Sequence, residues 1–342
     1  MTISHPDVHF YYPLAVRDRA TGVRYSPLST GLPGNYVWTV KTQALLSANG
    51  FPCRLVESMP EEGIIVTHRE FLANSTVPNS KQLFVCIVAD HRRHPFAQLH
   101  MVQNALDPML ARLSPSWPAG FVPHWTESGL VPRDSSRGLM LENVSYFGLP
   151  ARLAPQLRGD RFHALMRSHG YNFRIVPRNC WNDYSDTDAV LAVRSFAALP
   201  YHKFPPSKLY NSWLARVPAL LGSESAYQAE RRSPLDYFEV RSTDHILATL
   251  DHLRSNRLLR AAIVRNAAER AADLDASHIA HLWADFLEHI AVPAYHEWLQ
   301  ISPAKRRAFL AMRPLHYASF TAADFGARSV DFVRKELGAR LP

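Results

Sequence analysis

The segment from Lys203 to Ser225, KFPPSKLYNSWLARVPALLGSES, holds residue types that could bind a phosphate group. Pro205 and Pro206 stiffen the approach to Ser207, which we expect to be the N-cap of a helix. The first turn of that helix would offer free backbone N–H groups and the positive end of the helix dipole, and Lys208 would add a charge. The alternative is a capped helix whose lysine points into solvent, so neighbouring residues must decide.

Two neighbouring strand ends favour the phosphate interpretation. The run AVLAVR, from Ala189, places Arg194 at the carboxyl end of an expected strand, just before the loop that leads to Ser207. A guanidinium there could share a diphosphate with the Ser-Lys turn through bidentate contacts. Gly148 closes the expected strand NVSYFG, and a glycine lets the backbone approach a ligand closely. Together these residues predict a pyrophosphate site.

Residues suited to proton transfer end strands in the first half of the chain. Asp90 ends LFVCIVAD, His94 follows it, and His68 ends GIIVTH. A carboxylate or an imidazole at a strand's carboxyl end is well placed to abstract a proton. The alternative is that Asp90 caps the next helix and the histidines lie on the surface.

Three further residues have both a binding and a structural interpretation. Gly34 and Asn35 form a turn that could line a cleft near a sugar, or Asn35 could simply cap the following helix. Trp181 lies in a loop and could stack on a nucleobase, although core packing is the commoner fate of such a ring.

No cofactor and no metal ion are expected. Asp186 and Asp188 imitate a metal-binding Asp-x-Asp pair, but they precede AVLAVR and therefore lie at the end of the strand opposite the expected cleft. HExxH, Walker and nucleophile-elbow motifs do not occur.

The composition narrows the class of protein. The 342 residues carry a net charge of +8, which suits anionic partners, but no nucleic-acid motif occurs and no nucleic acid is expected. Three widely spaced cysteines, no signal peptide and no apolar run of membrane-spanning length predict a cytoplasmic protein. The basic, partly apolar segment from Pro303 could contact the inner face of an anionic membrane, or it could pack as a helix against the first domain.

Short apolar runs alternate with helical patterns, which predicts an α/β fold with parallel sheets. We expect an N-terminal Rossmann-like domain over residues 1–135, a C-terminal one over 136–300, and helices at 301–342 that close back toward the first domain. The first domain is expected to hold strands from Val8, Pro52, Gly63, Leu83 and Gly120, a helix within residues 34–50 that is capped by Gly50, and a helix at 94–106. The second is expected to hold strands from Asn143, Phe173, Ala189, Val217 and Asp236. Ligands of such sheets lie beyond the carboxyl ends of the strands, here in a cleft between the domains.

These segments resemble a known family. NVSYFG, AVLAVR and PPSKLYNSWLARVPALLGSESAY look like the donor-binding half of a GT-B glycosyltransferase, of the type found in bacterial surface-polysaccharide assembly. GNYVWTVKTQALLSANGFPCRLV is similar to the glycine loop and first helix of the acceptor domain. The resemblance implies two Rossmann-like domains and a nucleotide-sugar donor whose diphosphate meets Arg194 and Lys208 without a metal ion.

The sequence departs from the pattern of many retaining members of that group. Asn211 stands where those enzymes carry a glutamate, and it could still hydrogen-bond a ribose hydroxyl. Glu224 is the nearest carboxylate, in a different register, and is a second donor-binding candidate.

The resemblance implies transfer of a hexosyl or deoxyhexosyl group to a glycan or glycolipid. One alternative is a nucleotide-sugar epimerase on the same fold, which would turn over without an acceptor. The other is a non-catalytic module that binds an anionic glycan or nucleic acid through its basic face.

Overall fold

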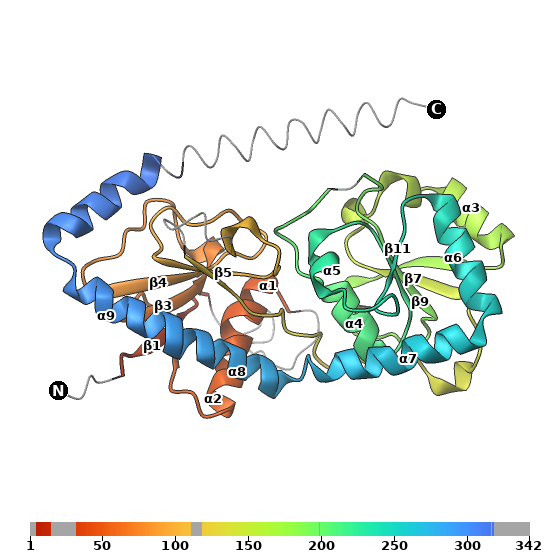
Figure 1. Ribbon diagram of the computed structural model, residues 1–342, viewed down its shortest axis with the longest axis horizontal. Coiled ribbons are helices and arrows are strands. Elements are labelled where there is room, and N and C mark those ends of the chain that lie inside the picture. Colours follow the sequence, from red (N-terminus) through yellow and green to blue (C-terminus); the bar gives the residue numbers. More distant parts are fainter. Residues whose placement is uncertain (1–4, 15–31, 111–117, 198, 316, 318–342) are drawn as a thin grey trace.

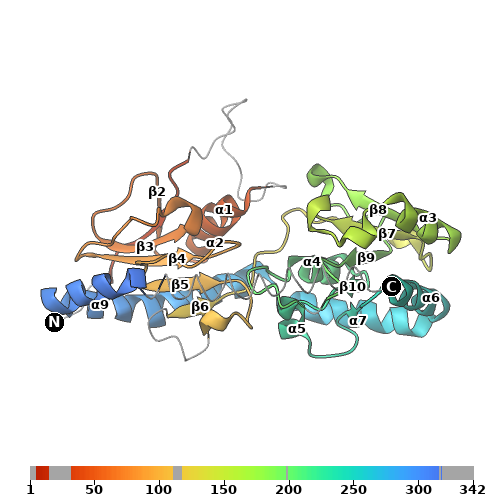
Figure 2. The same cartoon turned by 90° about the horizontal axis from the view of Figure 1, so that it is seen from above.

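The computed structural model describes residues 5–14, 32–110, 118–197, 199–315 and 317. Two domains lie side by side, each built around a parallel sheet, and two long helices run along them (Figures 1 and 2). The expected α/β architecture is therefore confirmed. No helix in the described part of the chain is long and apolar enough to cross a membrane.

The first sheet has the strand order β2-β1-β3-β4-β5-β6, and every neighbouring pair is parallel. Its strands are β1 (Val8–Tyr11), β2 (Arg54–Val56), β3 (Gly63–His68), β4 (Gln82–Ile87), β5 (Leu99–Val102) and β6 (Ala119–Phe121). All residues of β3, β4 and β5 are buried, as in a parallel sheet that is covered on both faces.

The prediction of a helix at 94–106 was wrong, because β5 lies within it. Every residue of β5 is buried, so the strand lacks the polar–apolar alternation that distinguishes a strand from a helix in sequence. The strand matters for the cleft because Gln103 and Asn104 follow it directly. Gln103 donates to the carbonyl of Lys203, and Asn104 donates to Ser225 Oγ at 2.8 Å, so both residues bond to the second domain.

Helices from both ends of the chain cover the first sheet. They are α1 (Gly34–Tyr36), the π-helical turn η1 (Val37–Lys41), α2 (Thr42–Ala48), α8 (Ala276–Phe286), the π-helical turn η8 (Leu287–Ala291) and α9 (Val292–Gln300). The sequence boundary assigned residues up to 300 to the second domain, whereas the return to the first domain begins at α8. The cause is the apolar stripe of α8, whose Trp283 and Phe286 pack in the same core as Phe10 and Trp38.

The second sheet has the order β11-β10-β9-β7-β8, again all parallel. Its strands are β7 (Asn143–Phe147), β8 (Asn172–Val176), β9 (Ala189–Ala192), β10 (Ala219–Leu221) and β11 (Phe238–Glu239). Its α-helices are α3 (Asp160–Ser168), α4 (Ser207–Ala215), α5 (Ser225–Glu230), α6 (Thr243–Ser255) and α7 (Arg257–Ala272). The α7 helix runs along this domain and α8 continues along the first (Figure 1).

Six short 3-10 turns complete the described structure: η2 (Arg69–Phe71), η3 (Pro108–Leu110), η4 (Ser135–Arg137), η5 (Pro150–Arg152), η6 (Pro155–Leu157) and η7 (Arg178–Cys180). Residues 303–315 are helical, as expected from Pro303. The helix expected from Ala322 lies outside the described residues.

Candidate functional site

A cavity of about 530 Å³ lies between the two domains, at the carboxyl ends of β3, β4, β7 and β9. Both domains line it, as the sequence predicts for ligand sites of parallel sheets. The predicted residues that line it are Gly34, Asn35, His68, Asp90, Gly148, Trp181, Arg194, Ser207, Lys208 and Asn211. His94 and Glu224 do not line it.

Arg194 follows the end of β9, and a carboxylate behind it fixes its orientation. Its Nε donates to Glu224 Oε2 at 2.9 Å, and its guanidinium lies 3.9 Å from the ring centroid of Phe204. Burial lowers the pKa of Arg194, but the Glu224 carboxylate outweighs that effect and raises it. Neither Nη atom has a hydrogen-bond partner among the described residues. Arg194 therefore lines the cavity with two donor groups available.

Glu224 was expected to contact the donor, and the structure places it differently. Its side chain is only 4% exposed, and its contact is with Arg194 rather than with the cavity. It is the N-cap residue of α5, so the turn after β10 directs it toward the end of β9. Glu224 therefore holds the Arg194 side chain in place through this ion pair rather than contacting the donor.

Lys208 adds a second cation beside Arg194. Burial and, to a smaller extent, the nearby Arg194 lower the pKa of its amine to about 8. Its Nζ lies 5.6 Å from the ring centroid of Tyr146, and no described residue accepts a hydrogen bond from it. A cation in this position gains most from an anionic ligand.

Ser207 is the first residue of α4 and not its N-cap. Pro206 takes the cap position with φ −79° and ψ 30°, and its carbonyl accepts from the N–H groups of Leu209 and Tyr210. The helix therefore begins one residue earlier than expected, because Pro206 rather than Ser207 takes the cap conformation. The Ser207 hydroxyl makes no capping bond, and the N–H groups of Ser207 and Lys208 belong to the first turn, which has no intrahelical acceptors.

Gly148 permits the close approach of β7 to α4. A Cβ at this position would lie 2.7 Å from Tyr146 Oη and 3.2 Å from Lys208 Cε. A side chain would therefore displace the two residues that border the cationic part of the cavity.

Trp181 and Asn211 line the cavity, but each is also held by a structural bond. Trp181 Nε1 donates to the carbonyl of Val176 at 3.1 Å. Asn211 Oδ1 accepts the N–H of Glu127 at 3.3 Å, which ties α4 to the segment that joins the domains.

His94 lies inside the first domain, where its ring bonds to backbone groups. It is fully buried, its Nε2 lies 2.9 Å from the carbonyl oxygen of Ala73, and its Nδ1 accepts the N–H groups of Phe96 and Ala97. Because both ring nitrogens bond within the first domain, the proposed proton-transfer role of His94 is not supported by its geometry.

His68 lines the cavity in a fixed tautomer. Its Nδ1 accepts the N–H of Glu70 at 3.3 Å, so Nε2 carries the ring proton. Burial, with smaller effects of charged neighbours including His91, lowers its pKa to about 4, so the ring is neutral near pH 7. In this state His68 is a hydrogen-bond donor rather than a base. A metal ion shared by His68, Glu70 and His91, whose ligand-type atoms lie within 4.8 Å of one another, would have to displace that bond.

Asp90 is the predicted carboxylate that remains accessible in the cavity. It is exposed, and its Oδ1 accepts from Gln103 Nε2 at 3.2 Å. Gln103 also donates to Lys203 in the loop before α4, so one amide joins Asp90 to the second domain.

Several lining residues escaped the sequence analysis. Arg152 lies four residues after Gly148, and its guanidinium is 5.1 Å from the ring centroid of Phe204. The available signal for Arg152 was its place just after Gly148, in the segment that follows the carboxyl end of β7. Other lining residues that were not predicted are Trp38, Glu70, Gln103, Trp125, Glu127, Tyr146, Arg178 and Phe204.

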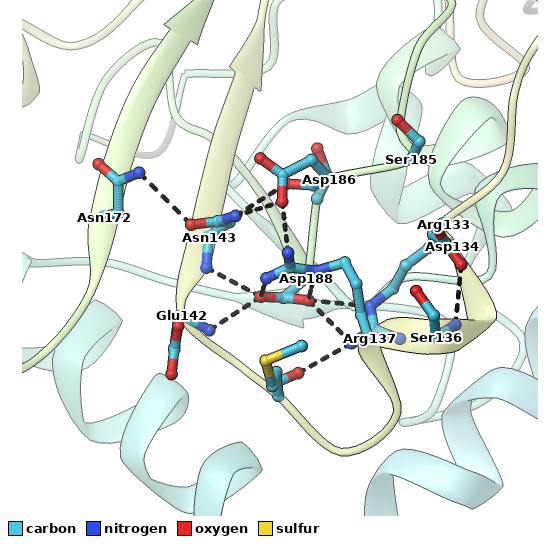
Figure 3. Close-up of polar contacts among 12 residues, drawn as sticks. Arg133, Asp134, Ser136, Arg137, Glu142, Asn143, Asn172, Ser185, Asp186 and Asp188 are labelled. Carbon is cyan, nitrogen blue, oxygen red and sulfur yellow. Dashed lines mark hydrogen bonds and ion pairs between the residues drawn. The ribbon is translucent and has the colours of Figure 1, made fainter.

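Asp186 and Asp188 lie at the amino end of β9, away from the cavity, in an arginine-rich network (Figure 3). Asp188 accepts from Arg133 Nε and Arg137 Nε, each at 2.9 Å, and from the N–H groups of Glu142 and Asn143. Burial raises the pKa of Asp188, but these donors outweigh it and lower the pKa to about 2. The network fastens the segment between the domains to the second sheet.

Comparison with known proteins identifies the architecture. No protein-family model matches the chain, and no curated protein matches it either. Among solved structures, HepE of Anabaena in complex with UDP-glucose is similar over 84% of this chain and 100% of its own, with a TM-score of 0.50 and 11% identity. AviGT4, a glycosyltransferase involved in avilamycin A biosynthesis, is similar over 86% of this chain and 98% of its own, with a TM-score of 0.47 and 11% identity. The likeness to HepE, with the two parallel sheets, confirms the expected GT-B fold of two Rossmann-like domains facing across a cleft.

Proposed function

We propose that this protein is a glycosyltransferase that moves a sugar from a nucleotide-sugar donor to a glycan or glycolipid acceptor. The observation that carries the proposal is the pair of cations at the carboxyl end of the second sheet. Arg194 presents two Nη groups and Lys208 an ammonium group, and no described residue bonds to them. A diphosphate matches this pair in charge and in hydrogen-bonding geometry.

The charges of the two cavity walls support different binding partners for the two domains. The second domain contributes Arg152, Arg178, Arg194 and Lys208, and no carboxylate from that domain is among the lining residues. The lining carboxylates belong to the first domain or to the segment between the domains: Glu70, Asp90 and Glu127. An anionic donor therefore fits the second domain, and a hydroxyl-bearing acceptor fits the first.

In the proposed reaction the acceptor oxygen forms a bond to the anomeric carbon as the bond from that carbon to the phosphate oxygen breaks. The leaving diphosphate takes the electron pair and is stabilised by Arg194, Lys208 and the first turn of α4. Asp90, across the cavity, takes the proton of the acceptor hydroxyl. These steps require no cofactor, in keeping with the sequence-based expectation.

The finer assignments extend the same proposal. UDP-glucose, the ligand of HepE, makes a hexosyl donor the first to test. Transfer of a hexosyl or deoxyhexosyl group during bacterial polysaccharide assembly, in the cytoplasm and beside an anionic inner membrane, remains a prediction from the sequence.

Nucleotide binding tests the proposal directly. Thermal unfolding with UDP, GDP, dTDP or CMP should reveal one nucleotide that raises the melting temperature, because a ligand of the native state stabilises it. Lys208→Ala should weaken the binding of that nucleotide by about tenfold or more, which is the loss expected for one charge-assisted contact. Arg194→Lys keeps the positive charge but loses the planar guanidinium, so it tests the bidentate contact of Arg194 with the diphosphate. Arg257→Ala, on the exposed face of α7, is the control.

Three outcomes would count against the transferase. The absence of any nucleotide effect, with salt-sensitive binding to polyanions, would favour a binding module. Turnover of a nucleotide-sugar without an acceptor, giving an isomer, would favour an epimerase. Unchanged binding by both Lys208→Ala and Arg194→Lys would remove the diphosphate site from this cavity.

A further inference from the structure

Gln103 lies where the two domains meet, and its side-chain amide bonds to both of them. It follows β5 directly, it is 3% exposed, and it lines the cavity. Its Nε2 donates to Asp90 Oδ1 at 3.2 Å in the first domain and to the carbonyl oxygen of Lys203 in the second. One buried amide nitrogen therefore connects the proposed base to the opposite wall of the cavity.

The two partners determine which way the amide of Gln103 faces. An ionised carboxylate and a backbone carbonyl only accept hydrogen bonds, so the amide nitrogen, and not its oxygen, must face both of them. The nitrogen carries a separate hydrogen for each acceptor. Asp90 is exposed and accepts no other bond from the described residues, so its Oδ2 is left for the acceptor hydroxyl.

The backbone is strained next to both of these acceptors. Ala89, immediately before Asp90, has φ 46°, and Tyr201, two residues before Lys203, has φ 47°. Only three non-glycine residues in the described part of the chain have a positive φ, and the third is the C-cap of α4. Such a conformation costs free energy and persists where the surrounding structure requires it, often at functional sites. Both strained residues thus lie beside the hydrogen bonds of Gln103.

The Lys203 side of this connection belongs to the donor-binding wall. Phe204 is the next residue, and the guanidinium of Arg194 lies 3.9 Å from the centroid of its ring. Gln103 therefore joins Asp90 to the segment that packs against the arginine proposed to bind the diphosphate.

We propose that Gln103 is a positioning residue that aligns the Asp90 carboxylate for proton transfer from the acceptor hydroxyl. The inference rests on the proposed function, in which Asp90 takes that proton. Gln103 holds Oδ1, so the proton of the acceptor hydroxyl goes to Oδ2. Because the same amide nitrogen bonds to Lys203, the alignment of Asp90 depends on contact between the two domains.

Asn104 offers a matched control, because it makes a similar contact between the domains without touching Asp90. Its Nδ2 donates to Ser225 Oγ at 2.8 Å and to the carbonyl oxygen of His202 at 3.2 Å. It is 1% exposed, and it is not among the residues that line the cavity. Asn104→Ala therefore removes bonds between the domains while Asp90 keeps its own.

Gln103→Met keeps the length of the side chain and removes both hydrogen bonds. The assay is release of UDP from UDP-glucose with methyl glucoside or water as the acceptor, or of GDP from GDP-mannose if the nucleotide screen selects guanine. In Gln103→Met, kcat should fall about tenfold to hundredfold, as expected for one hydrogen bond to a charged group, while Kd for the free nucleotide stays within about twofold of wild type. Asn104→Ala should keep kcat within about threefold of wild type. Gln103→Glu has the same shape but no donor, so it should lower kcat at least as far as Gln103→Met.

A double-mutant cycle separates positioning from general support of the fold. If Gln103 acts through Asp90, adding Gln103→Met to Asp90→Asn should change kcat by less than about twofold, because the group that Gln103 aligns has already been removed. An equal fold-loss with and without Asp90→Asn would overturn the inference. Equal losses in Gln103→Met and Asn104→Ala, or a wild-type kcat in Gln103→Met, would overturn it as well.

Carbon-13 NMR of the aspartate side chains gives a readout that does not depend on turnover. The Asp90 carboxyl signal, identified by its loss in Asp90→Asn, should move in Gln103→Met and stay in place in Asn104→Ala. An unmoved signal in Gln103→Met would overturn the inference. Wild-type protein that binds no nucleotide at all would overturn the proposed function itself, whereas wild-type binding and turnover with an unaffected Gln103→Met would overturn only the role of Gln103.

Discussion

Arg194 and Glu224 form an ion pair, with Nε to Oε2 at 2.9 Å, behind the cationic wall of the cavity. The second carboxylate oxygen, Oε1, is buried and has no hydrogen-bond partner. Burial raises the pKa of Glu224, while Arg194 and Lys208 act in the opposite direction. One carboxylate thus offsets part of the positive charge of two cations before any ligand binds.

Glu224→Gln should therefore have opposite effects on stability and on binding. The free protein should lose about 1–3 kcal/mol of unfolding free energy, because a charge-assisted bond to Arg194 becomes a neutral one. A diphosphate should then bind more tightly, since two cations are no longer partly neutralised. Denaturant unfolding and calorimetry with UDP measure the two effects. If UDP bound more weakly to Glu224→Gln, orientation of the guanidinium would outweigh its charge.

The pKa of Lys208 predicts a pH dependence. Its value of about 8 in the free protein lies below the ordinary lysine value, so the folded protein releases this proton at lower pH than the unfolded chain. Between those two values the unfolded chain binds more protons, and stability contributed by this group rises with pH. Binding has the opposite sign, because the diphosphate needs the ammonium form.

Affinity for UDP-glucose should accordingly fall as pH rises through about 8, and Lys208→Arg should remove the fall because a guanidinium stays charged. Calorimetry from about pH 7 to about pH 9.5 covers the range, and a nucleotide-sugar avoids the titration of a terminal phosphate near about pH 6. A pH dependence equal in wild type and Lys208→Arg would assign it to another group.

Gly148→Ala should damage both stability and nucleotide binding. The added Cβ would meet Tyr146 Oη at 2.7 Å and Lys208 Cε at 3.2 Å, and overpacking of this kind costs about 1–3 kcal/mol. Gly159→Ala is the matched control, because no atom lies within 4 Å of its added Cβ. Thermal unfolding and UDP calorimetry on the two variants would reveal the difference, and equal behaviour would exclude steric crowding at Gly148.

The sequence could predict those parts of the site that depend on local signals. Strand ends at Gly148 and Arg194, and the Pro-Pro-Ser-Lys start of α4, are readable because turn chemistry and strand length are local properties. Parallel topology then brings such ends to one edge of a sheet.

Long-range contacts account for what the sequence did not predict. Glu224 pairs with Arg194 across 30 positions of sequence, so the partner of that carboxylate could not be read from its neighbours in the chain. The apolar stripe of α8 indicates that the helix is buried, but it does not identify which sheet covers it.

Asp90 and His94 give the sharpest separation of a catalytic from a structural role. Asp90→Asn should lower kcat by about 10²- to 10⁴-fold if its carboxylate takes the acceptor proton, while the melting temperature stays near that of wild type because the side chain is exposed. His94→Ala should lower the melting temperature instead, because it leaves buried N–H and carbonyl groups of Phe96, Ala97 and Ala73 without their partner. The readouts are release of the nucleotide from its sugar in the presence of a glycan acceptor, and thermal unfolding of each variant. An Asp90→Asn enzyme with wild-type kcat would mean that another group in the cavity, or the departing phosphate itself, receives the proton.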